Sequence, residues 1–133
     1  MTVENILRDY NLKSTACRKF IINELLRSQT ALTEHEIKTS FPDLFDRVTF
    51  YRTLKTLEDA GVIHKIVLQD NTIRYAVSKK PFHEQDIHSH FHCCVCNEVF
   101  CIQNKSQINI ELPQGFVQHR VSMIVEGVCA ACN

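Results

Sequence analysis

Two Cys-x-x-Cys pairs constrain the fold of this chain more than any other feature of its sequence. The first pair is Cys93 and Cys96, and the second is Cys129 and Cys132. Each pair can present two thiolates from one tight turn, and two such turns supply the four sulfur ligands of a tetrahedral Zn²⁺ site. Because four protein ligands leave no open coordination position, we expect a structural zinc that joins two distant segments and contributes to folding.

Disulfides and a thioredoxin-type redox centre are the alternative interpretations of these pairs. The first ten residues lack the apolar core of a secretory signal, and no apolar run approaches the roughly 20 residues that cross a bilayer. We therefore predict a cytoplasmic protein with no membrane partner, in a compartment that keeps thiols reduced. A redox pair would open a helix, whereas residues 92–102 read as strand, turn and strand.

A second group of potential metal ligands lies around the first cysteine pair. His88 and His90 are two residues apart on a predicted strand, so their imidazoles project from one face. His92 continues that face, and a hairpin return would bring Cys101 beside His88 and His90. The group predicts a second metal site; the alternative is a set of exposed polar side chains.

The charge of the chain is distributed unevenly along its 133 residues. Residues 1–80 contain 13 basic and 10 acidic side chains, whereas residues 81–133 contain 2 and 5. Six of the seven cysteines and five of the seven histidines lie beyond residue 80. We therefore predict two domains, residues 1–79 and residues 80–133.

Three helices are predicted in the first domain. Each begins at a residue whose side-chain oxygen can cap backbone N–H groups, and these caps are Ser14 or Thr15, Thr33 and Asp46. The first helix runs to about Ser28. The second opens with a capping box completed by Glu36 and ends before Pro42, and the third ends just before Gly61.

The third helix combines an apolar face with a polar, basic one. Phe50, Leu54 and Leu57 recur at helical spacing. The other faces carry Arg47, Thr49, Arg52, Thr53, Lys55 and Thr56. Two β-rich runs, residues 62–68 and 73–77, then predict a hairpin. This order is typical of a winged helix-turn-helix, whose helix enters the DNA major groove; a helical bundle with a solvated polar face is the alternative.

The segment beyond Ile102 predicts a small α/β unit, which makes the whole chain α+β. Residues 108–112 alternate as in a strand or a short helix, and residues 116–125 predict a strand with Val121, Met123 and Val125 on one face. So few strands leave one sheet face uncovered. We expect a second copy of the chain to cover it, and a homodimer also suits paired DNA half-sites.

No spacing in the sequence pairs a nucleophile with a base and an orienting third group, so we predict that the protein is not an enzyme. A zinc-stabilised adaptor that binds protein instead of DNA is the other alternative. It would carry an apolar patch on the third helix where this chain has Arg52, Thr53 and Thr56.

The combined motifs resemble those of the ferric uptake regulator (Fur) family of bacterial metal-sensing transcription factors. The matching motifs are Lys13-x-Thr15-x-x-Arg18, residues 48–54 with Leu57 and Gly61, His88-x-His90-x-x-Cys93-x-x-Cys96 and Gly127-x-Cys129-x-x-Cys132. The resemblance implies a homodimeric repressor with an N-terminal winged-helix DNA-binding domain and a C-terminal dimerisation domain that holds structural zinc.

The resemblance also implies residue roles. The double-stranded DNA operator would be contacted by Lys13, Arg18, Thr49, Tyr51 and Arg52. A second, sensory metal would set the relative orientation of the domains, so that metal loading favours the DNA-binding geometry.

The chain departs from the family where sensory ligands are expected. Ala31 stands where many members have a histidine, Cys101 where they have a carboxylate, and Val121 where a histidine is common. His83 is our first choice for an additional ligand beside His88, His90 and Cys101.

These substitutions bear on which divalent metal is sensed. Imidazoles with one thiolate suit tetrahedral Zn²⁺ better than octahedral Fe²⁺ or Mn²⁺. We therefore expect a zinc-responsive repressor, with an iron-responsive or peroxide-responsive regulator of the same family as the alternative. Cys94 and Cys101 also leave a thiol-oxidation role open.

Overall fold

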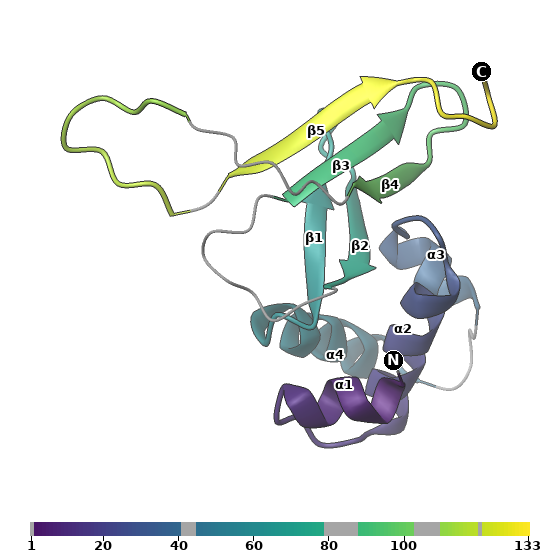
Figure 1. Cartoon of the computed structure of the whole chain (residues 1–133). Helices are drawn as coiled ribbons and strands as arrows, with labels where there is room; N and C mark the ends of the chain where they lie inside the picture. Colours follow the sequence, from purple (N-terminus) through teal and green to yellow (C-terminus); the bar gives the residue numbers. More distant parts are fainter. Residues whose placement is uncertain (1, 41–44, 79–87, 103–109, 120) are drawn as a thin grey trace. The chain divides into compact units, whose positions relative to one another are not determined.

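The computed structural model describes residues 2–40, 45–78, 88–102, 110–119 and 121–133, with His88 as backbone alone (Figure 1). The chain divides into two compact units, Met1–Pro81 and Phe82–Asn133. In the described residues, the first unit contains α1 (Val3–Asp9), α2 (Ala16–Arg27), α3 (Glu34–Thr39), α4 (Arg47–Asp59), β1 (Ile63–Val67) and β2 (Ile73–Val77). The second contains β3 (His88–Cys93), β4 (Val99–Ile102) and β5 (Ser122–Gly127). The predicted α+β class is confirmed.

The predicted caps of α2, α3 and α4 are confirmed. The Thr15 hydroxyl accepts a hydrogen bond from the backbone N–H three residues later, at 3.3 Å. Thr33 forms the reciprocal capping box with Glu36. At α4 the Asp46 carboxylate accepts from the Thr49 N–H at 2.6 Å. These bonds satisfy N–H groups that have no partner within the helix, so each helix begins where the sequence predicts.

The core of the first unit lies where the helices pack against β1 and β2. Its fully buried side chains include Leu7, Ile21, Ile22, Ile37, Leu57, Val62 and Ile63. The prediction that Thr53 belongs to the polar face of α4 is wrong, because its side chain is buried. Its hydroxyl donates to the Thr49 carbonyl at 2.7 Å, which satisfies the polar group inside the helix.

The predicted hairpin is confirmed as β1 and β2, which pair antiparallel from Ile63 opposite Val77 to Val67 opposite Ile73. Gly61 adopts the left-handed φ of +84° that a side chain would strain, so the chain can leave α4 and enter β1 sharply. The hairpin with the preceding helices forms the winged helix.

The second unit is a three-stranded sheet in the order β4-β3-β5 (Figure 1). The central strand β3 runs antiparallel to β4 and parallel to β5. The predicted strand over residues 116–125 is wrong in its bounds, because β5 begins only at Ser122. Phe116 and Val117 instead follow a turn and are 67% and 77% exposed.

The predicted element over residues 108–112 falls partly outside the described residues. Its described part, residues 110–112, forms neither strand nor helix. Within the described chain, no helix combines the length and the apolar character that a membrane crossing needs.

Candidate functional site

The first cysteine pair occupies the reversal between β3 and β4. Cys93 is the last residue of β3, and its N–H donates to the Glu98 carbonyl at 3.0 Å. The Cys93 carbonyl accepts from the Asn97 N–H, also at 3.0 Å. Asn97 has a left-handed φ of +64°, which directs the chain from this turn toward β4. We call residues 93–98 the first knuckle.

The second cysteine pair follows β5 directly. The Cys129 carbonyl accepts from the N–H groups of Cys132 and Asn133 at 3.1 and 3.0 Å, which closes a second turn. We call residues 129–133 the second knuckle. Because β3 and β5 are parallel and end in register at Cys93 and Gly127, both knuckles lie at the same edge of the sheet.

The four cysteines named from the sequence come together. The sulfurs of Cys93, Cys96, Cys129 and Cys132 all lie within 4.8 Å of one another, and none is in a disulfide. The Cys96 and Cys129 sulfurs are 3.9 Å apart. Four sulfurs around Zn²⁺ at 2.3 Å would be roughly 3.8 Å apart, so the cluster has the dimensions of a tetrahedral thiolate site and can hold a metal ion.

The thiols of this cluster ionise unequally. The N–H groups of Cys96 and Cys129 donate to the Cys93 sulfur at 3.5 and 3.4 Å and lower its pKa to about 6. Hydrogen bonding with the Cys129 thiol, together with burial and the other sulfurs, raises the pKa of Cys132 to about 12. Full deprotonation would gather four negative charges, which a divalent cation compensates.

The register of β3 and β4 arranges part of the second predicted cluster. His90 and Cys101 are directly opposite each other, so both side chains project from the same face of the sheet. His90 is buried and Cys101 is exposed. The backbone of His88 lies two residues before His90 on β3. His83 lies outside the described residues, so the ligand set stays a prediction.

The predicted DNA-contacting residues on α4 lie on its exposed side. Thr49 and Arg52 are exposed, and Tyr51 is 38% exposed. Two cations lie over the ring of Tyr51, with Lys38 of α3 5.7 Å and Arg47 5.5 Å from its centroid. Sequence reasoning missed the contact with Lys38, since no local pattern links a residue of α3 to one of α4.

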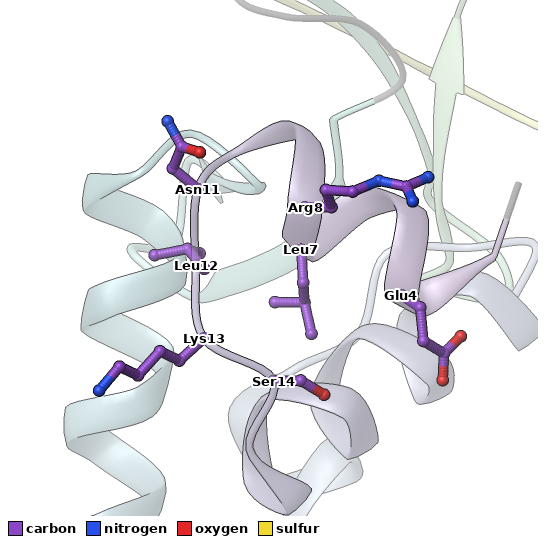
Figure 2. A pocket seen from close by; sticks show the side chains of 7 residues that line it. All are labelled: Glu4, Leu7, Arg8, Asn11, Leu12, Lys13 and Ser14. Atoms are coloured by element: carbon purple, nitrogen blue, oxygen red, sulfur yellow. The ribbon is translucent and has the colours of Figure 1, made fainter.

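Lys13 and Arg18 lie near the start of α2. The Arg18 guanidinium donates to the Lys13 carbonyl at 2.8 Å, which holds the two residues together. Lys13 is exposed and borders an open pocket of about 380 Å³ beside α1 (Figure 2). Glu4 and Arg8 border the same pocket, so its walls carry both signs of charge.

Comparison with known proteins places the chain in a family. The family model described as "Ferric uptake regulator family" matches residues 9–125. A ferric uptake regulation protein of Campylobacter upsaliensis is 31% identical, covering 98% of this chain and 86% of the relative. The corresponding protein of Campylobacter jejuni is 32% identical, covering 98% and 85%.

Solved structures show the same fold. The ferric uptake regulator of Helicobacter pylori superposes with a TM-score of 0.64 at 21% identity, covering 99% of this chain and 94% of that one. A zinc uptake regulator in complex with zinc and DNA gives a TM-score of 0.67 at 21% identity, covering 97% and 89%. The chain therefore belongs to the ferric uptake regulator family of metal-responsive, DNA-binding transcription regulators, which are not enzymes.

Proposed function

We propose that this protein is a cytoplasmic, zinc-responsive repressor of metal-homeostasis genes that binds a double-stranded DNA operator as a homodimer. Residues 1–79 form the DNA-binding domain, and residues 80–133 form the dimerisation domain that binds metal. The position of Cys101 opposite His90 is the observation that favours zinc as the sensed metal.

A structural Zn²⁺ bound by Cys93, Cys96, Cys129 and Cys132 is the first part of the proposal. The sulfur spacing supports a tetrahedral ion. Bound zinc supplies the bonds that join the two knuckles. Because few of the described side chains of this unit are buried, metal binding contributes directly to its folding.

The sensory site is the second part. His90 and Cys101 offer one imidazole and one thiolate from neighbouring strands, and His88 and His83 are the candidates for the remaining positions. A thiolate is a softer ligand than a carboxylate and favours Zn²⁺ over Fe²⁺ or Mn²⁺. Metal that binds the DNA-competent arrangement of the homodimer more tightly shifts the population toward it.

DNA recognition is the third part. Thr49 and Tyr51 of α4 enter the major groove, and Lys13, Arg18 and Arg52 contact the phosphate backbone. The exposure of the three α4 side chains supports this assignment. The two cations beside Tyr51 add positive charge at the same surface, where the phosphates of a duplex would lie.

An iron-responsive regulator is the second candidate. The observation that favours it is the identity of 31% and 32% to two ferric uptake regulation proteins. Iron and zinc sensing differ in which ion promotes operator binding, so the two candidates give opposite orders of metal potency.

The test is operator binding by the purified homodimer, titrated with Zn²⁺, Fe²⁺ and Mn²⁺ in metal-buffered, anaerobic solution. A duplex selected from a random library supplies the operator. The proposal predicts two zinc ions per chain and half-maximal DNA binding at a lower free concentration of Zn²⁺ than of the other ions. Activation by Fe²⁺ at concentrations where Zn²⁺ is ineffective would establish the iron-responsive candidate instead.

A further inference from the structure

We propose that His92 is a positioning residue for the four-cysteine metal site, and that its imidazole holds the two knuckles in ligand geometry. The inference rests on the proposed metal at the four cysteines. His92 lies on β3 immediately before Cys93 and is not one of the four cysteine ligands. Its side chain is 16% exposed. It contacts Asn97, which follows the first cysteine pair, and Glu126, which lies on the strand before the second pair.

The contact with the first knuckle is a short hydrogen bond. His92 Nε2 lies 2.6 Å from Asn97 Oδ1. An amide oxygen only accepts hydrogen bonds, so Nε2 carries the proton and donates it. Asn97 is the residue directly after Cys96, its N–H donates to the Cys93 carbonyl at 3.0 Å, and its left-handed backbone directs the chain from the knuckle toward β4. The imidazole therefore holds the residue that closes this knuckle.

The contact on the other side of the ring reaches the strand that leads to the second knuckle. His92 is opposite Glu126 in the parallel ladder of β3 and β5, and Nδ1 lies 4.0 Å from the Glu126 carboxylate. Glu126 precedes Cys129 by three residues. Between them, the Gly127 carbonyl accepts from the Cys94 N–H at 2.8 Å. One side chain thus spans the approaches to both cysteine pairs.

Such a span matters because the affinity of a metal site depends on how well its ligands are oriented before the ion arrives. Groups that orient the ligands without touching the metal are typically worth about 10- to 100-fold in affinity. Without the His92 hydrogen bond, the Asn97 side chain loses its contact with β3, and the Cys96 thiolate must be ordered when the metal binds. We therefore expect zinc to leave the four-cysteine site faster when this hydrogen bond is removed.

The alternative role for His92 is as a further ligand of the second cluster, because it projects from the same face as His90 and Cys101. The hydrogen bond to Asn97 occupies Nε2, and Glu126 faces Nδ1. One ring nitrogen is therefore directed at a residue of the first knuckle and the other at the strand that leads to the second knuckle, which favours the positioning role.

The experiment measures zinc transfer from the zinc-loaded, full-length protein to excess EDTA, with zinc content followed by elemental analysis. His92→Phe removes both ring nitrogens and should release zinc from the four-cysteine site about 10- to 100-fold faster than wild type. His92→Gln keeps an N–H donor near the position of Nε2 and should restore slow release. His35→Phe, at an exposed histidine of α3, is the matched control and should behave as wild type.

A second variant separates positioning from general destabilisation. Asn97→Gly keeps the left-handed backbone but removes the accepting oxygen, so it should match His92→Phe. The double variant should release zinc no faster than either single variant, because both remove one interaction. With Co²⁺ in the site, the visible ligand-field bands should shift in His92→Phe and Asn97→Gly and remain as wild type in His92→Gln.

Equal rates in wild type and His92→Phe would overturn the positioning role, as would additive effects in the double variant. A wild-type protein that holds no zinc at its four cysteines would instead overturn the proposed structural site. The two failures are therefore distinguishable.

Discussion

His90 and Cys101 are directly opposite each other on the antiparallel strands β3 and β4. The pair joins an imidazole and a thiolate on one sheet face, in a unit whose other cysteine cluster is complete without them. The register of this hairpin thus keeps the proposed mixed-ligand site apart from the four-sulfur cluster.

Cys101→Ala should weaken the binding of the second zinc equivalent while the first stays bound. Loss of a direct ligand should lower the affinity for this zinc by more than about tenfold. Loss of a group that only hydrogen-bonds to a metal ligand already lowers metal affinity by about tenfold. Isothermal titration with Zn²⁺ and zinc-dependent DNA binding are the measurements. Cys94→Ala, at another exposed cysteine, is the control. Unchanged stoichiometry and unchanged DNA binding in Cys101→Ala would remove Cys101 from the sensory site.

Cys129→Ser should unfold the second unit and leave the first folded. Zinc binding in small four-ligand sites is worth about 10–16 kcal/mol and is coupled to folding. Amide hydrogen exchange should show β3 and β5 losing protection while α2 and α4 keep theirs. Cys94→Ser should change neither unit. Full protection of β5 in Cys129→Ser would show that the sheet is stable without the metal.

Arg52→Ala should weaken binding to every duplex and lower the slope of log K against log salt by about 1, as expected for a phosphate contact. Loss of affinity for the operator alone would instead assign Arg52 to a base. Arg27→Ala removes an exposed arginine of α2 that pairs with Glu24 and serves as the control. Wild-type affinity and salt slope in Arg52→Ala would contradict the role of α4 as the recognition helix.

Gly127→Ala should destabilise the second unit. A Cβ atom on Gly127 would lie 3.2 and 3.3 Å from carbons of the Phe91 ring, a close approach that costs about 1–3 kcal/mol. Chemical denaturation of the zinc-loaded protein measures the free energy of unfolding. Phe91→Leu in the same background should recover part of the loss. A stability gain from Gly127→Ala alone would show that the ring moves aside freely.

The cap of α4 should make the first unit sensitive to acid. Hydrogen bonding to Thr49 lowers the pKa of Asp46 below its usual 3.8, so the charged form is favoured in the folded state. The stabilisation is complete above the unfolded pKa and is lost as the pH falls through the folded one. Asp46→Asn keeps the cap without the titration and should flatten this part of the acid-unfolding profile. An identical profile in both proteins would exclude the contribution.

The helix starts and the two knuckles were predictable because their signals are local. Thr33 with Glu36, Asp46, and Gly61 act within one turn of their own position. The four cysteines were predictable because their spacing leaves few alternatives.

Most of the features that the sequence did not predict depend on contacts between residues that are distant in the sequence. β5 starts at Ser122 because pairing with β3 decides its bounds, which alternation along residues 116–125 does not reveal. The contacts of Tyr51 with Lys38 and of His92 with Asn97 depend on how helices and turns are placed in space. Thr53 is buried because its hydroxyl finds a partner in its own helix, which hydropathy does not register.

X-ray absorption at the zinc edge, on protein carrying one zinc per chain, tests the central claim most directly. The four-cysteine site predicts a first shell of four sulfur atoms at about 2.3 Å, with no nitrogen or oxygen neighbour. A shell containing imidazole nitrogen or carboxylate oxygen would contradict the account, because the first metal would then occupy a site other than the two knuckles.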